Sequence, residues 1–381
     1  MAFQSISLAT ILLALPLQLA HAQGTVPTFH HAAGPNSYTL LGGEPAQDVT
    51  TQIPTVLVPV MLSFEAKKTA GKPFVMDAAQ DVPPLLRSPV FSQFAFPSGG
   101  ATQYADALLR TTFPKRDQWH TLLGKPEVKP VRITVPAGYG YILTSKQSGR
   151  SLAVVDIEFL QREIFQQLPK QAGQLVIAIT HNTTYYALGD ATVCCSWGTH
   201  GVDSATGNSF VLASYLQDAP AVVEDQDVQP LTQQLAEFVK DPLHDPLLHG
   251  RNLKGPGNVF PAWMRPASMR PGDQGGCGGT GAASTYFLLE PTNTNPKNNV
   301  PASTAYTAHL NGSIYHLQNT ALLPWYTGPA AGLGATYSFP DAQALPHPPR
   351  SPARPVVAAL PARLSPLPPH SRAPAHPTAI S

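Results

Sequence analysis

Prolines are spread through this chain densely enough to limit the length of its helices. The sequence has 41 prolines among 381 residues, and proline inside a helix removes a hydrogen bond and clashes with the preceding turn. Short elements joined by many loops are therefore expected. Charged residues make up only 12% of the chain, and the formal net charge is +1. No basic stripe is visible, so nucleic acid is not the expected partner.

Residues 1–22 have the features of a secretory signal peptide. An apolar run from Ile6 to Leu19 precedes Ala20-His21-Ala22, a small-x-small cleavage pattern. The first five residues contain no Lys or Arg, although a signal peptide usually begins with a positively charged segment. The alternative for this segment is a membrane anchor. The run is short of the roughly 20 apolar residues that a membrane span needs. The sequence therefore predicts a secreted or periplasmic chain with no transmembrane segment after cleavage.

The two ends of the mature chain differ in composition. Residues 341–381 contain eleven prolines and four arginines, with no acidic residue after Asp341. Such a segment buries too little apolar surface to offset its conformational entropy. The sequence predicts one domain over residues 23–340 and a disordered, basic, proline-rich tail over residues 341–381.

The order of predicted elements favours an α+β fold: a mixed sheet, then one helix packed against it, then an irregular C-terminal part. Apolar periodicity predicts an irregular arm, strands, helices and two hairpins. The arm is 23–53; the strands are 54–64, 152–156, 175–180, 191–197 and 209–215; the helices are 88–94, 102–110, 157–168 and 228–240; the hairpins are 131–144 and 306–318. The second hairpin, around Asn311-Gly312, could bring His309 and His316 face to face.

The segment from Leu231 to Pro242 resembles a zinc-hydrolase helix whose working residues are replaced. In the H-E-x-x-H pattern two histidines hold zinc and the glutamate is the general base. Here Gln233 takes the first ligand position, Gln234 the base position and Glu237 the second ligand position. A glutamine amide is a poor zinc ligand and has no basicity at neutral pH. The alternative is an ordinary amphipathic helix.

Two histidine-containing segments are further candidates for metal or ligand binding. His200 follows a strand and lies among glycines, so it could be a metal ligand beside Glu237, or a hydrogen-bonded loop histidine. His244 and His249 follow the motif helix closely and could belong to a rearranged metal site. Prolines interrupt that second segment, and a solvated turn is the alternative.

The chain has three cysteines, at positions 194, 195 and 277. Cysteines of exported proteins commonly pair, and neighbouring cysteines rarely bond to each other because the intervening peptide would be strained. The sequence predicts a disulfide from Cys277 to Cys194 or to Cys195.

Taken in order, these motifs resemble a group of uncharacterised exported bacterial proteins that are distantly similar to the plant phosphate-induced, EXORDIUM-type secreted proteins. The family segments C-C-x-x-G-x-H, H-E-x-x-E-x-x-x-D-P and V-x-P-x-W, and a later cysteine, correspond to Cys194–His200, Gln233–Pro242, Val259–Trp263 and Cys277. Further landmarks are Thr102-Gln103-Tyr104 with Asp106-Ala107, and Tyr315-His316 with Leu323-Pro324-Trp325. The resemblance implies a zincin-like fold and an extracellular location.

Two functions are compatible with this resemblance. The first is a catalytically inactive, zincin-like exported protein that needs no cofactor and binds a partner, such as a cell-surface polymer or protein. The second is an active metallohydrolase with weakly bound zinc and a site rearranged around His200, Glu237, His244 and His249. The chain departs from the family at Gln233 and Gln234, which favours the first function.

Overall fold

The computed structural model describes residues 26–33, 36–65, 74–113, 117–187, 189–191, 194–218, 226–243, 305–322 and 338–342. The chain divides into two units, residues 1–348 and 349–381. Every described residue belongs to the first unit, so the predicted signal peptide and almost all of the predicted tail lie outside the described residues.

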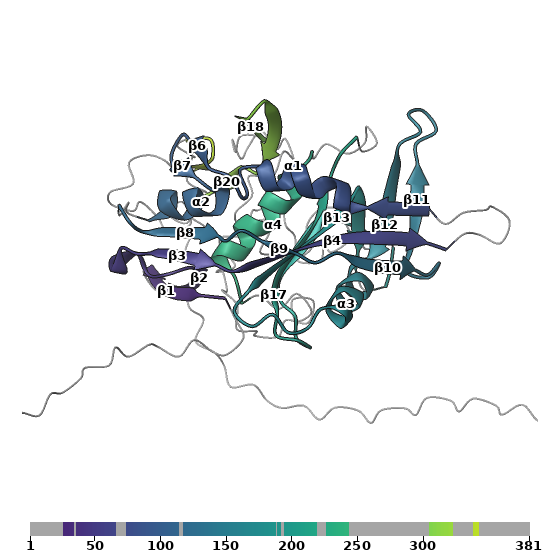
Figure 1. Ribbon diagram of the computed structural model, residues 1–381, viewed down its shortest axis with the longest axis horizontal. Coiled ribbons are helices and arrows are strands. Elements are labelled where there is room, and N and C mark those ends of the chain that lie inside the picture. Colours follow the sequence, from purple (N-terminus) through teal and green to yellow (C-terminus); the bar gives the residue numbers. More distant parts are fainter. Residues whose placement is uncertain are drawn as a thin grey trace, which may run out of the picture. The chain divides into compact units, whose positions relative to one another are not determined.

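A mixed sheet forms the centre of the first unit (Figure 1). Its strand order is β10-β4-β13-β17-β16, in which the first four strands are parallel and β16 runs antiparallel to β17. The short strands β5 and β9 also pair with β4. The bounds are β4 Thr55–Phe64, β5 Phe74–Asp77, β9 Glu127–Val128, β10 Val131–Val135, β13 Leu175–His181, β16 Gly198–Val202 and β17 Ser209–Tyr215.

Both faces of this sheet are buried, as near-continuous apolar strands require. In β13, Leu175, Ile177 and Ile179 belong to one core, and Val176 and Ala178 belong to the other. The first core also contains the apolar residues of α2 (Tyr104–Thr112) and α4 (Gln229–Lys240). The second contains those of α3 (Ile157–Gln167). Helices therefore cover both faces of the sheet.

A second sheet of four strands has the order β11-β12-β14-β15. Its strands are β11 Gly140–Thr144, β12 Ser151–Asp156, β14 Thr183–Tyr186 and β15 Cys194–Ser196. Only Asn182 separates β13 from β14, and its backbone is left-handed with φ 41°. Asparagine tolerates this region better than most residues, so it can redirect the chain from one sheet into the other.

The α+β class is confirmed, with a mixed sheet packed on the predicted motif helix. Strands at 54–64, 152–156, 175–180 and 209–215 and the helix at 228–240 are present within a residue or two of their predicted bounds.

Two predictions in the N-terminal half were wrong. The segment 23–53 is not irregular, because β1 Thr28–Ala33 and β2 Asn36–Leu41 form a hairpin and β3 Thr50–Ile53 pairs with β8 His120–Leu123. No helix spans 88–94; α1 is Val82–Arg87, where a Pro-Pro pair occupies the first turn, a position that proline tolerates. The remaining short elements here are η1 Pro45–Gln47, η2 Ala78–Asp81, β6 Phe94–Phe96 and β7 Gly100–Thr102.

The two predicted hairpins had different outcomes. The one at 131–144 was wrong, because β10 pairs with β4 whereas β11 pairs with β12. The C-terminal one is confirmed as β18 Tyr306–Leu310 with β19 Ser313–Leu317. Its register places His316 opposite Thr307 and His309 opposite Ile314, so the two histidines do not face each other. The last short strands are β20 Thr320–Ala321 and β21 Ser338–Phe339.

Candidate functional site

The motif helix α4 packs against β16 and β17, at the edge of the central sheet. Pro230 lies in the first turn of this helix. Asp241 follows the last helical residue, Lys240, and precedes Pro242. Apart from Gln233, all its residues are buried, including Gln234, Glu237 and Lys240. A helix with polar side chains on a buried face needs partners for them.

Gly198 allows α4 and β16 to approach closely. A Cβ atom at this position would lie 2.5 Å from the Leu212 carbonyl oxygen and 2.6 Å from Cγ of Gln234. Only glycine fits there without displacing backbone. The glycine of the C-C-x-x-G-x-H segment is thus a packing residue, and it brings Gln234 next to the strand that carries His200.

His200, Gln234 and Glu237 form one buried polar cluster, which we call the motif cluster. His200 Nδ1 lies 3.1 Å from Gln234 Oε1 and 3.3 Å from Glu237 Oε2. All three residues are at most 5% exposed. A single imidazole N–H can be shared between the two oxygens, so the cluster holds β16 to α4 by hydrogen bonds.

The Glu237 carboxylate governs the protonation of His200. Burial lowers the pKa of this imidazole. The hydrogen bond and charge of Glu237, together with the Gln234 hydrogen bond and the Asp241 charge, outweigh that effect and raise the pKa above its ordinary 6.5. A proton on His200 Nδ1 is therefore favoured, and a protonated nitrogen cannot ligate a metal.

The register of the motif differs from the predicted one. Gln233, the expected companion of Glu237 one turn away, is only half-buried and takes no part in the described contacts of the cluster. Gln234, three residues before Glu237, occupies that place instead. The structure places His200 and Glu237, which the sequence analysis assigned to one site, in direct contact.

The described residues of this cluster supply two side chains of the kind that ligate zinc, His200 and Glu237. A catalytic zinc needs three protein ligands and an open position. Within the described ranges, no three His, Cys, Asp or Glu side chains gather closely enough to hold a metal ion. His244 and His249, the other candidates for a rearranged site, lie outside the described residues.

Further buried polar groups surround the motif cluster. Tyr104 donates its hydroxyl proton to the Gln318 carbonyl at 2.7 Å, and burial together with the nearby Glu237 charge raises its pKa. Lys240 Nζ donates to Thr112 Oγ1 at 3.3 Å, and burial lowers the pKa of this lysine to about 7. Tyr104 thereby joins α2 to Gln318, just after β19, and Lys240 joins the end of α4 to α2.

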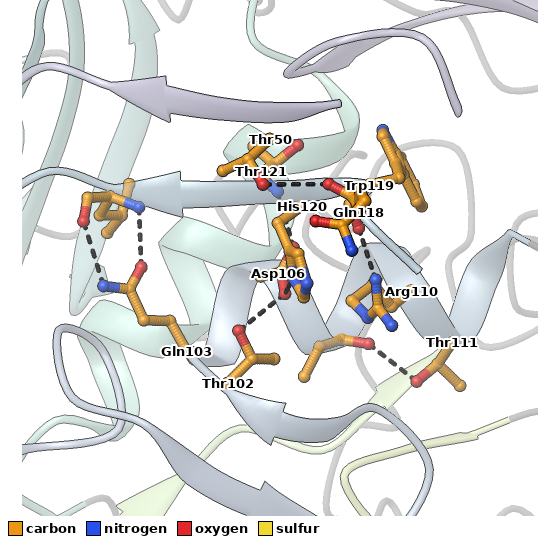
Figure 2. A network of polar contacts seen from close by, with 12 residues as sticks. Thr50, Thr102, Gln103, Asp106, Arg110, Thr111, Gln118, Trp119, His120 and Thr121 are labelled. Carbon is orange, nitrogen blue, oxygen red and sulfur yellow. Dashed lines mark hydrogen bonds and ion pairs between the residues drawn. The ribbon is translucent and has the colours of Figure 1, made fainter. Parts of the chain in front are cut away.

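The segment Thr102–Ala107 fastens α2 to β8, as Figure 2 shows. Asp106 is fully buried and accepts hydrogen bonds from Thr102 Oγ1 at 2.7 Å, His120 Nδ1 at 2.8 Å and the Thr121 N–H at 2.6 Å. Gln103 accepts from the Leu123 N–H at 2.7 Å and donates to its carbonyl at 3.0 Å. The sequence marked this segment, and the structure gives it a positioning role: it fixes the helix that carries Tyr104.

The cysteines follow the prediction only in part. Cys195 is disulfide-bonded, and Cys194 lies beside it in β15. Cys277 lies outside the described residues, so its pairing with Cys194 or Cys195 stays a prediction.

Comparisons of the chain with protein-family models, with curated proteins and with solved structures found no match. The resemblance to exported, EXORDIUM-type proteins therefore remains a prediction from the motifs. In the described part of the chain, no helix combines the length and the apolar character that crossing a membrane requires.

Proposed function

We propose that this protein is exported and acts without catalysis, by binding a partner at the cell surface or outside the cell. One observation carries the non-catalytic part: Gln234 and Glu237 both contact the same nitrogen of His200 in a buried cluster. The residue in the base position is an amide, and removing a general base alone lowers a rate by about 10²–10⁴. The export part rests on the signal-like segment 1–22.

One observation favours the alternative, an active metallohydrolase. Glu237 Oε1 is buried and accepts no hydrogen bond from the described residues, and a buried carboxylate oxygen can attract a cation. Among the described residues, His200 is the one further ligand beside this oxygen, and the two do not complete a zinc site. The alternative therefore needs ligands from beyond the described residues, such as His244 or His249.

The two functions are separated by single substitutions on α4. Gln234→His places a second imidazole beside His200 and Glu237, which completes a set of three ligands. Gln233→His, its matched control, places the imidazole on the half-buried side of the helix. We expect no stoichiometric zinc in the unmodified protein or in Gln233→His, and measurable zinc in Gln234→His by elemental analysis.

The outcomes bear on different parts of the proposal. Zinc in the unmodified protein, with hydrolysis of peptide or ester substrates that a chelator abolishes, would establish the alternative. Zinc in Gln233→His alone would show that the motif has the register inferred from the sequence. Export is tested separately, by sequencing the N-terminus of protein recovered from outside the cytoplasm, which should begin at Gln23.

A further inference from the structure

A second polar cluster lies where the parallel strands β13 and β17 end. Their last residues, His181 and Tyr215, are partners in the register of the two strands. Open sheets of parallel strands bind ligands outside the carboxyl ends of their strands. With Asp81, Asp227 and His316, these residues form what we call the carboxyl-edge cluster.

The first pair in this cluster has an unused acceptor. His181 Nδ1 lies 2.9 Å from Asp81 Oδ2, and Asn182 Nδ2 lies 3.1 Å from His181 Nε2. The Asp81 side chain is fully buried, yet its Oδ1 has no hydrogen-bond donor among the described residues. Burial raises the pKa of Asp81, although His181 opposes this. A buried carboxylate oxygen without a donor destabilises the fold, so its presence calls for a reason.

The second pair connects two distant segments. Asp227, just before α4, accepts from the His316 backbone N–H at 2.9 Å and pairs with His316 Nδ1 at 2.5 Å. It thereby ties the β18–β19 hairpin to the start of the helix. Asp227 and Asn182 both have left-handed backbones, with φ 36° and 41°. Asparagine and aspartate adopt this conformation more readily than other non-glycine residues.

Both carboxylates act on Tyr215. Burial, then the charge of Asp227, then that of Asp81 raise the pKa of its hydroxyl, while Arg87 opposes them. The geometry agrees: Asp227 is bridged to Leu216, the neighbour of Tyr215, and Asp81 pairs with His181, the strand partner of Tyr215. Tyr215 itself is largely buried, whereas His181 and His316 are partly exposed and reach the surface.

We infer that the carboxyl-edge cluster binds a ligand through an ammonium group, which donates a hydrogen bond to Asp81 Oδ1 and lies beside Tyr215. An ammonium group supplies what the described residues do not give Asp81 Oδ1, a charged hydrogen-bond donor. The aromatic ring adds a cation–π attraction. This inference goes beyond the proposed function and does not depend on it, because the motif cluster is a separate set of residues.

The probe is 1,4-diaminobutane, compared with 1,4-butanediol, which has the same length and no charge. Binding is followed by calorimetry at constant ionic strength. Asp81→Asn removes the acceptor charge. Its matched control, Asp156→Asn, also removes a buried carboxylate but keeps the helix cap of α3, since asparagine caps helices as well as aspartate. We expect the diamine to bind the full chain, and Asp81→Asn to weaken it at least about tenfold, the usual effect of losing a charge-assisted hydrogen bond.

A second measurement needs no variant. In the unmodified protein, the imidazole resonances of His181 and His316 should shift when the diamine is added and should not shift with the diol. Equal binding of diol and diamine would overturn the inference, as would unchanged binding by Asp81→Asn. Diamine-induced shifts confined to residues outside the cluster would overturn it too.

Discussion

Asp106 provides the sharpest test of how the structure positions α2 and Tyr104. Its buried carboxylate accepts three hydrogen bonds, from Thr102, His120 and the Thr121 N–H, all at 2.8 Å or less. Asp106→Ala removes all of them and leaves the Thr121 N–H without an acceptor. Hydrogen bonds to charged groups contribute about 1.5–3 kcal/mol each but are not additive. Breaking a buried pair costs about 3–5 kcal/mol, and we expect a loss of unfolding free energy in that range.

Asp106→Asn should cost less than Asp106→Ala. The amide oxygen can keep the Thr121 N–H, the Thr102 hydroxyl can rotate to accept, and His120 can change tautomer. We expect a loss of about 1.5–3 kcal/mol, the value of one hydrogen bond to a charged group. The control is Asp77→Ala, which removes one bond to the Ala79 N–H at 2.9 Å and should cost about 1 kcal/mol.

The assay is urea unfolding followed by circular dichroism, with the midpoint and slope fitted for each variant. The expected order of loss is Asp106→Ala, then Asp106→Asn, then Asp77→Ala. If Asp106→Ala costs no more than Asp77→Ala, the network does not hold α2, and the positioning role given to the Thr102–Ala107 segment is wrong.

Three further predictions concern other parts of the chain. Gly198→Ala should destabilise the protein by about 1–3 kcal/mol through overpacking, whereas Gly138→Ala, where an added Cβ meets nothing within 4 Å, should be near neutral in the same assay. Asp227 raises the pKa of His316 mainly through its hydrogen bond. The stabilisation that this pair gives the fold is therefore full below about pH 6.5 and is lost as the pH rises through the folded pKa of His316. The difference in unfolding free energy between the unmodified protein and His316→Gln should shrink as the pH rises, and a difference that grows with pH would refute this. Limited proteolysis that removes the predicted tail, residues 341–381, should leave the melting temperature unchanged, and a large drop would show that this segment stabilises the domain.

The sequence predicted the parts of the fold that depend on local pattern. The apolar run 175–180 and the periodic segment 228–240 are predictable because an element that is buried on one or both sides has a regular pattern of apolar residues in its sequence. The segment 131–144 misled because Pro136-Ala137-Gly138 has the composition of a turn. The strands on either side of this turn do not pair with each other: β10 pairs with β4, much earlier in the chain, and β11 pairs with β12, the strand that follows it. Strands β1 to β3 were missed because mixed polar and apolar residues hide their alternation.

The same limit applied to the sites. His200 and Glu237 were found because a spaced motif marked them, but the helix phase that selects Gln234 over Gln233 depends on how α4 packs on β16. Asp81 was missed altogether. It lies 100 residues from His181, and a lone aspartate gives no signal in the sequence. The one available clue was Tyr315-His316, flagged as a landmark, whose partner Asp227 only the fold reveals.

The state of His200 tests the central claim most directly, namely that hydrogen bonds replace a metal in the motif cluster. Nuclear magnetic resonance of nitrogen-labelled protein reports whether Nδ1 of this imidazole carries a proton, with His200→Gln identifying the signal. The account predicts a protonated Nδ1 hydrogen-bonded to Glu237 and Gln234, unchanged when one equivalent of zinc is added. A shift of either imidazole nitrogen signal of His200 on adding zinc, whether Nδ1 loses its proton or Nε2 binds the metal, would contradict it.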